Sequence, residues 1–181
     1  MVELRRCFVA VPIPDEIRMA LADVLSDTRF PGRFSSPQRW HITLRFLGEI
    51  DDITYERFLN AFEEEDLSDP FRVTMSGLGA FPGPKRAKVV WAGITDGTAH
   101  LEALSASAEE AAETAGLEPE DRPFRPHLTL SVLRPAQDVT GLLHSAPDFD
   151  LSWKCDQVIV YESHLGRGPA RYEPLETFRL G

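Results

Sequence analysis

The sequence lacks three features that would place it in whole classes of protein: a cysteine framework, a net positive charge and a long apolar run. Cysteine occurs only twice in 181 residues, as Cys7 and Cys155, each within an apolar, strand-like stretch. Two such distant thiols form neither a disulfide framework nor a CxxC metal or redox site. We therefore interpret both as small buried hydrophobic residues.

Apolar runs are short throughout the chain. No stretch approaches the roughly 20 apolar residues that a transmembrane helix needs. The run at residues 7–13 is too short for the apolar region of a signal peptide, and Pro12 interrupts it. The sequence therefore predicts a cytoplasmic protein without a membrane anchor.

Basic residues are outnumbered, 19 against 29 acidic ones, so the formal net charge is −10 at pH 7. A surface of this sign does not hold long nucleic acid by counterion release alone, so any contact with nucleic acid must be local. The acidic residues gather in runs such as 63–66 and 118–121, which are typical of solvated helix faces.

Composition and periodicity predict one α+β domain. The chain is 43% hydrophobic and 27% charged, which is ordinary for a globular protein, and it is long enough for one core or two small lobes that share a core. Apolar periodicity predicts helices at 15–27, from 52 to before 70, and at 98–115; it predicts strands at 6–11, 40–47, 71–78, 87–94, 124–133, 150–153, 157–163 and 172–180. Few strand–helix–strand units precede a continuous apolar strand, so the pairing is expected to be mostly antiparallel.

The informative feature is an internal repeat of a four-residue motif. His41-Ile42-Thr43-Leu44 and His127-Leu128-Thr129-Leu130 repeat one pattern, His-apolar-Thr-Leu, on two predicted strands. Side chains alternate between the faces of a strand, so each copy presents one imidazole and one hydroxyl on the same face. Two such strands side by side would line a cleft with two of each.

That set of groups suits chemistry at a phosphate. Histidine titrates near pH 6.5, so one copy can be neutral and the other protonated near neutral pH, as an acid and a base require. Threonine hydroxyls can donate to the non-bridging phosphate oxygens. A single HxT is usually structural, but its recurrence on the same face of two strands favours a functional interpretation.

The runs Trp40 to Gly48 and Phe124 to Leu130 resemble the paired HxT motifs of the 2H phosphoesterase superfamily, in its RNA 2′,3′-cyclic phosphodiesterase (2′-5′ RNA ligase-like) group. The resemblance covers nearly the whole chain, which would be a single bilobal domain, residues 1–181, with an internal duplication. It implies two mostly antiparallel sheets related by a pseudo-two-fold axis around a central cleft, with the helices outside.

The resemblance also implies an activity and a set of roles. The enzyme would hydrolyse 2′,3′-cyclic phosphates at RNA ends, or in small nucleotides, to 2′-phosphomonoesters, without a metal or cofactor and as a monomer. His41 would be the proton donor and His127 the proton acceptor, while Thr43 and Thr129 hold the phosphate. The same residues could also catalyse the reverse joining of RNA ends through a 2′-5′ linkage.

One departure concerns the phosphate-binding cation. Members of the group often carry an arginine five positions after the second His, where this chain has Val132. Arg45, Arg125 and Arg134 are the candidates to supply the charge in its place. An even offset from His41 places Arg45 on its face, whereas the odd offset from His127 directs Arg134 away in a regular strand.

Other residues are left with two interpretations or with no role. Phe124 is either a stacking platform for a nucleobase or a core residue, because Pro123 and Pro126 make regular alternation around it unlikely. His100, His144 and His164 lack a partner motif, so they receive no role.

Two other functions stay open. A metal hydrolase could use two histidines, but neither HxT copy has an Asp, Glu or Cys at ligand spacing. A non-catalytic module that binds RNA-terminal phosphates would use the same residues without turnover.

Overall fold

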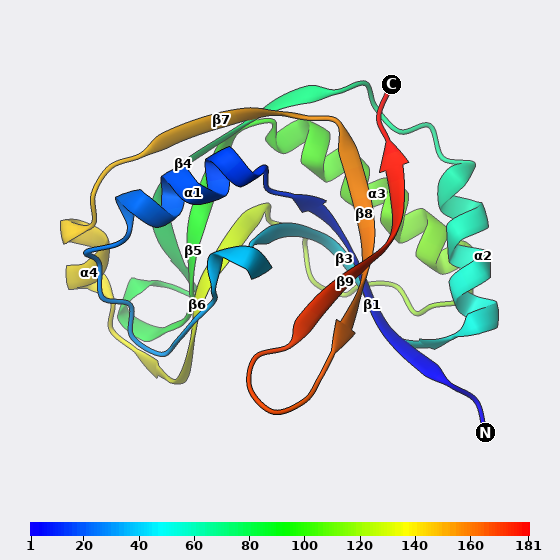
Figure 1. The fold of residues 1–181 in the computed structure, drawn as a ribbon, viewed down its shortest axis with the longest axis horizontal. Coiled ribbons are helices and arrows are strands. Elements are labelled where there is room, and N and C mark those ends of the chain that lie inside the picture. The colour runs from blue at the N-terminus through cyan, green and yellow to red at the C-terminus, as the bar shows by residue number, and fades with distance from the viewer.

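Nine β-strands and four α-helices make up the computed structural model, which describes residues 1–181 (Figure 1). The strands are β1 Leu4–Pro12, β2 Arg33–Phe34, β3 His41–Asp51, β4 Phe71–Phe81, β5 Ala87–Asp96, β6 His127–Gln137, β7 Asp150–Cys155, β8 Gln157–His164 and β9 Arg171–Arg179. The helices are α1 Asp15–Val24, α2 Asp52–Glu63, α3 Thr98–Thr114 and α4 Thr140–Ser145, with 3₁₀ turns η1 Pro37–Arg39 and η2 Pro84–Arg86.

All strands join one sheet in which every pairing is antiparallel. The order is β7-β4-β5-β6-β3-β1-β8-β9, and the short β2 pairs with β6. In the middle, β3 meets β6 through one residue pair, Ile42 with Leu128. The sheet therefore consists of a first half-sheet (β3, β1, β8, β9) and a second half-sheet (β6, β5, β4, β7), joined at the two HxT strands. The predicted α+β class with antiparallel pairing is confirmed, but the two expected sheets are joined into one through the Ile42–Leu128 pair.

The helices begin and end where local chemistry requires. Asp51 caps α2, because its Oδ1 accepts a hydrogen bond of 2.8 Å from the Thr54 N–H. Behind α3, Gly116 adopts a φ of +96°, the left-handed conformation that ends many helices. In Figure 1, α2 and α3 lie together beside the first half-sheet. No helix combines the length and apolar character that spanning a bilayer demands.

The main core explains why the HxT side chains face outward from it. Ile42, Leu44, Leu128 and Leu130 are all at most 4% exposed and belong to one cluster of 33 buried residues. Burying a side chain of this size stabilises the fold by roughly 1.5–3 kcal/mol. These four residues fix the faces of both strands, so the intervening histidines and threonines turn to the opposite side. Cys7 and Cys155 are buried free thiols, as predicted.

The structure differs from the predicted elements at several boundaries. β3 continues beyond Gly48, which adopts a φ of +77°, and β6 begins at His127 rather than at Phe124. The later start follows from Pro123 and Pro126, because proline lacks the N–H that a strand ladder uses. The elements β2 and α4 are too short to produce a clear periodic pattern and were not predicted.

Candidate active site

Each HxT strand carries a β-bulge directly after its threonine. Thr43 pairs with Ala10 and the next pair is Arg45 with Val9, so Leu44 is the extra residue in β3. Thr129 and Ser131 flank the corresponding extra residue, Leu130, in β6. A bulge of one residue reverses the faces of all side chains that follow it. Directly beyond each bulge, residues at odd offsets from the histidine therefore share its face, up to the next register shift, which comes after Phe46 in β3 and after Val132 in β6.

The histidines and threonines of both motifs line one cleft, which has a volume of about 1100 Å³. This is slightly above the roughly 300–1,000 Å³ typical of small-molecule sites. Because β3 and β6 are neighbours, both motifs meet in the middle of the sheet. The predicted pairing of His41 and Thr43 with His127 and Thr129 in one cleft is thus what the chain builds.

Backbone carbonyls orient both imidazoles in the same way. Nδ1 of His41 lies 2.8 Å from the Arg39 carbonyl oxygen, and Nδ1 of His127 lies 2.6 Å from that of Arg125. A carbonyl oxygen can only accept, so Nδ1 carries the hydrogen and donates it in both rings. In the neutral ring this leaves Nε2 as a proton acceptor. Nε2 of His41 accepts from the Thr43 hydroxyl at 2.8 Å, a contact that His127 lacks.

Aromatic side chains surround both histidines. The Phe8 ring lies 4.8 Å from the His41 ring, and Tyr172 meets His41 edge-on at 5.3 Å. Phe81 meets His127 edge-on at 5.0 Å. These walls exclude water from one side of each imidazole and hold its plane.

Burial lowers the pKa of both imidazoles. For His41 it lowers the pKa to about 4, and the positive charge of Arg39 and the proximity of His127 act in the same direction. Burial also lowers the pKa of His127. In these surroundings both rings are neutral at pH 7, which differs from the expectation that one carries a proton. A bound phosphate anion would reverse this effect, since an opposite charge nearby raises a histidine pKa.

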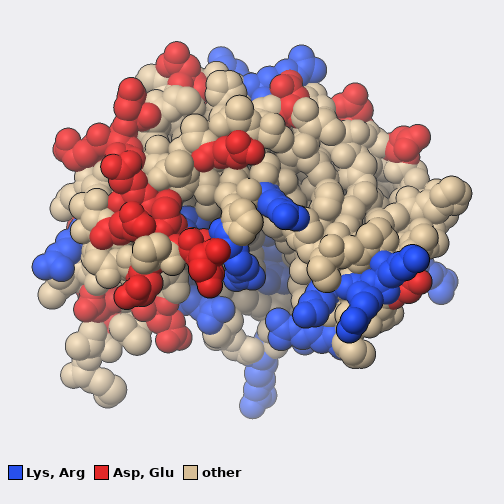
Figure 2. Space-filling model, turned by 180° about the vertical axis from the view of Figure 1, so that it is seen from behind, with Lys and Arg blue, Asp and Glu red and all other residues tan.

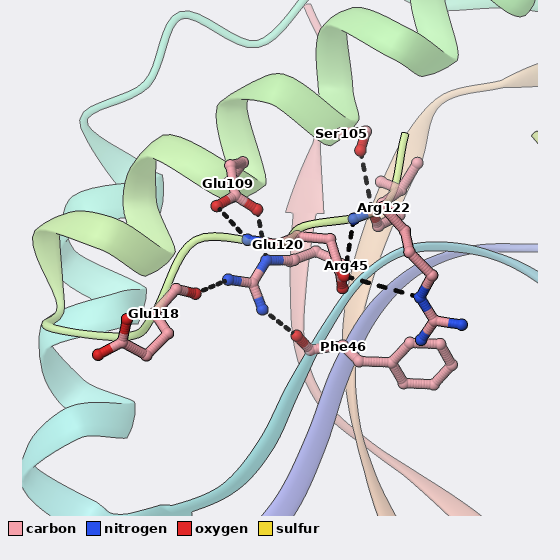
Figure 3. A network of polar contacts seen from close by, with 8 residues as sticks. Arg45, Phe46, Ser105, Glu109, Glu118, Glu120 and Arg122 are labelled. Carbon is pink, nitrogen blue, oxygen red and sulfur yellow. Dashed lines mark hydrogen bonds and ion pairs between the residues drawn. The ribbon is translucent and has the colours of Figure 1, made fainter. Parts of the chain in front are cut away.

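The prediction that Arg45 faces the cleft with His41 is wrong. Arg45 is 8% exposed, and its Nε donates to Glu109 Oε2 on α3 at 2.6 Å (Figure 3). Its other nitrogens donate to the carbonyls of Phe46 and, at 2.7 Å, of Glu118. The bulge at Leu44 is the reason, because it turns Arg45 away and brings Phe46 into the cleft wall.

The cleft receives neither Phe124 nor the Arg125 side chain, which were the other suggested substrate contacts. Phe124 packs against the main core, so the core interpretation is the correct one of the two. The Arg125 guanidinium lies 5.9 Å from the ring centre of Phe81, and only its carbonyl serves the site, through His127.

Four arginines line the cleft: Arg6, Arg33, Arg39 and Arg134. Of these, the sequence had suggested only Arg134 as a source of the charge. None of them forms an ion pair, and no acidic residue lines the cleft. Figure 2 shows basic side chains in and around a central hollow, while acidic ones gather on the side where α2 lies. The prediction that Arg134 points away is wrong, because the bulge at Leu130 reverses its face. The bulge arises from the pairing of β6 with β5, which the sequence pattern alone does not predict.

One group of side chains could hold a metal ion, and it lies outside the cleft lining. Glu162, His164 and Glu173 on the β8–β9 hairpin have potential ligand atoms within 4.8 Å of one another. Arg5 already donates to Glu162 at 3.2 Å, and His164 contacts Glu173 at 2.9 Å. Neither HxT histidine belongs to this group.

Known proteins share this architecture. A family model described as the 2′-5′ RNA ligase superfamily matches residues 13–167. An RNA 2′,3′-cyclic phosphodiesterase of Escherichia coli is 31% identical over 99% of each chain, and one of Thermus thermophilus is 34% identical over 97% of this chain and 90% of its own. The crystal structure of E. coli LigT with 3′-AMP matches with a TM-score of 0.84 and 28% identity, over 98% of this chain and 99% of that one. On the extent of these matches, the chain belongs to the 2′-5′ RNA ligase superfamily.

Proposed function

We propose that this protein hydrolyses 2′,3′-cyclic phosphodiesters at RNA ends to 2′-phosphomonoesters, by general acid–base catalysis between two histidines and without a metal. One observation carries the proposal. Two imidazoles, each with Nδ1–H fixed on a carbonyl, share an arginine-lined cleft that contains no carboxylate. Such a site attracts a phosphodiester and offers it two nitrogens that can exchange protons.

The two histidines would act on opposite sides of the phosphorus. Nε2 of His127 accepts a proton from a water molecule as its oxygen attacks the phosphorus. The bond from phosphorus to the 3′ oxygen breaks, and His41 gives this oxygen a proton from Nε2. The Thr43 and Thr129 hydroxyls donate to the non-bridging oxygens, which hold the developing charge.

For His41 to donate, it must first be protonated, and the substrate itself would promote this step. The cyclic phosphate carries a negative charge, which favours imidazolium in the cleft. Burial and the nearby Arg39 oppose this rise in the pKa of His41, so the protonated ring remains able to give up its proton. It can then transfer this proton to the departing oxygen.

The similar proteins support the same chemistry. Relatives from E. coli and T. thermophilus are named RNA 2′,3′-cyclic phosphodiesterase, and the similar LigT was solved with 3′-AMP. The reverse reaction, joining RNA ends through a 2′-5′ bond, would use the same two proton transfers. In dilute aqueous solution we expect hydrolysis to dominate.

The test compares wild type with His41→Ala and His127→Ala on an RNA oligonucleotide that ends in a 2′,3′-cyclic phosphate, in the presence of EDTA. Wild type should release a 2′-phosphate end, and each variant should lose roughly 10²–10⁴-fold in rate. His144→Ala is the matched control, because His144 is exposed and lies outside the cleft. Loss of wild-type turnover in EDTA would contradict the metal-free mechanism, and binding without turnover would favour a binding module.

We further propose that the protein works as a cytoplasmic monomer. All residues that line the cleft come from one chain, and the two buried cysteines are free thiols. Sedimentation equilibrium tests whether the protein is a monomer, and cell fractionation tests whether it is cytoplasmic.

A further inference from the structure

The two ends of the cleft differ in chemistry although the two strands that build them correspond. Five and seven residues after its histidine, β3 places Phe46 and Gly48 in the cleft wall. At the same offsets β6 places Val132 and Arg134. Phe46 is 58% exposed, so one end offers an open aromatic ring beside Arg6, and the other end offers the unpaired Arg134.

The arginine end has a second unpaired cation. Arg33 on β2 pairs in register with Val132, and its exposed side chain also lines the cleft. Beyond it, η2 lies against β6 and contributes Lys85 and Arg86, neither of which forms an ion pair. Together, Arg33, Arg134, Lys85 and Arg86 form what we call the basic track.

The opposite end of the cleft, where Arg6 lies, is bordered by acidic residues. Arg6 lies across from Glu49 in the strand register, and Asp51 and Asp52 follow at the end of β3 and the start of α2. Figure 2 shows the acidic side chains on the α2 side and basic ones along the lower edge of the other side. A polyanion that leaves the cleft is therefore repelled at the Arg6 end and attracted along the basic track.

Arg134 is too far from the reacting phosphate to bind it. It follows Thr129 by five residues, one of which is the extra residue of the bulge, so the two lie about 13 Å apart along the strand at roughly 3.3 Å per residue. An arginine side chain does not bridge that distance. The group that Arg134 meets must therefore be a different part of the substrate, and an unpaired guanidinium in an acid-free wall is suited to a phosphate.

We propose that the RNA chain preceding the cyclic phosphate leaves the site over Arg33 and Arg134, so that these residues bind upstream phosphates while the terminal base stacks on Phe46. This inference rests on the proposed function and adds the path along which the RNA chain leaves the cleft. Stacking on Phe46 tolerates any base, because every nucleobase has a π-face. The site is therefore selective for oligonucleotides over cyclic mononucleotides, with little preference for the terminal base.

The test measures kcat/KM for 2′,3′-cyclic AMP and for a trinucleotide that ends in adenosine 2′,3′-cyclic phosphate. Arg134→Gln should lower the value for the trinucleotide about fivefold more than the value for the mononucleotide. The slope of log(kcat/KM) for the trinucleotide against log salt concentration should become less negative by about 0.7, the loss of one phosphate contact. Arg72→Gln is the control, because Arg72 is an exposed, unpaired strand arginine outside the cleft.

Arg6→Gln tests the direction, since Arg6 lines the opposite end of the cleft. A selective loss on the trinucleotide with Arg6→Gln but not with Arg134→Gln would overturn the proposal. Equal losses on both substrates with Arg134→Gln would also overturn it, because they would mean contact with the reacting phosphate.

Binding measurements separate this inference from the proposed function. If wild type turns over neither substrate, the proposed function fails, but calorimetric titration of 2′-AMP and of a trinucleotide with a terminal 2′-phosphate still tests the track. Arg134→Gln should weaken the trinucleotide about fivefold more than 2′-AMP. An unchanged ratio of the two affinities would refute the track by itself.

Discussion

At the scale of single residues, the two cleft histidines share one restraint and differ in another. Both donate Nδ1–H to the carbonyl two residues earlier, which fixes the tautomer without involving a charged group. Only His41 has a second contact, from the Thr43 hydroxyl, and only His41 has the charge of Arg39 beside it. The motif copies are therefore alike in orientation and unlike in the groups that contact the imidazole.

The depressed pKa of His41 makes the protein less stable in mild acid. Its folded pKa of about 4 lies below the unfolded value near 6.5, so the unfolded chain binds the proton first. The contribution is complete above pH 6.5 and is lost as the pH falls towards 4, to a total of about 3 kcal/mol at roughly 1.4 kcal/mol per pKa unit. Urea unfolding of wild type and His41→Gln between pH 7 and 5 should show a shallower decline for the variant. Parallel curves would contradict the buried, neutral ring.

A phosphate anion should raise the pKa of His41. Opposite charge within a few ångströms moves a titrating group by roughly one to three units towards its charged form. Titration of the His41 ring nitrogens by NMR, with and without inorganic phosphate, measures the shift, and the exposed His144 serves as the internal reference. If phosphate leaves the His41 pKa unchanged, the substrate does not create the acid that the proposed mechanism requires.

At the scale of elements, Arg45 connects three segments that meet behind the cleft. It ties β3 to α3 through Glu109 and to the segment before β6 through the Glu118 carbonyl, while Glu109 also accepts from the Glu120 N–H at 3.0 Å (Figure 3). The segment that this network holds leads directly to His127. Arg45, which the sequence suggested as a substrate-binding cation, thus holds β3, α3 and the segment before β6 together instead.

Arg45→Ala should therefore reduce stability and not the chemistry. Glu109 would be left without its cation, and because it is partly exposed we expect a loss of about 2 kcal/mol, between the values for surface and buried pairs. Thermal unfolding measures the loss, and kcat/KM for 2′,3′-cyclic AMP well below the melting temperature should stay within about threefold of wild type, which is below 1 kcal/mol. A tenfold or larger loss of kcat/KM in that assay would show that Arg45 contributes to catalysis or substrate binding.

A second element-scale prediction concerns the wall behind His127. A Cβ atom on Gly79 of β4 would overlap the indole of Trp91, its pairing partner on β5, whose ring lies 6.4 Å from that of His127. Gly79→Ala should cost roughly 1–3 kcal/mol of stability through overpacking and should also lower kcat/KM. Gly83→Ala is the control, because nothing lies within 4 Å of its Cβ position. If both variants behave alike in unfolding and activity assays, the Trp91 wall does not position His127.

The sequence predicted what depends on local pattern. The shared face of His41 and Thr43, the start of α2 at residue 52 and the end of α3 before residue 116 each follow from a few neighbouring residues. The two bulges depend on which strand lies alongside, so the faces of Arg45 and Arg134 could not be derived from offsets alone. The arginines contributed by β1, β2 and η1 were missed because only the tertiary fold brings them to the cleft.

At the scale of the whole molecule, a net charge of −10 surrounds a cleft whose charged lining residues are four arginines. The electrostatic field of the acidic surface repels a polyanion, whereas the field of the cleft and of the basic track attracts one. Affinity for RNA should therefore come from its end and not from its length.

This contrast sets a limit on how much RNA the protein uses. The basic track offers four unpaired cations beyond the histidines and threonines that hold the terminal phosphate. Affinity should therefore rise as the RNA grows from one to about five phosphates and then stop rising, because each further phosphate meets no new cation. Fluorescence anisotropy with labelled oligonucleotides of one to eight residues, each ending in a 2′-phosphate, measures this limit at fixed salt. The same series with 3′-hydroxyl ends should bind at least tenfold more weakly, since the histidine and threonine groups then have no phosphate to hold. A steady gain in affinity with every added nucleotide would show that the acidic surface does not oppose RNA, and that a longer basic path lies outside the track.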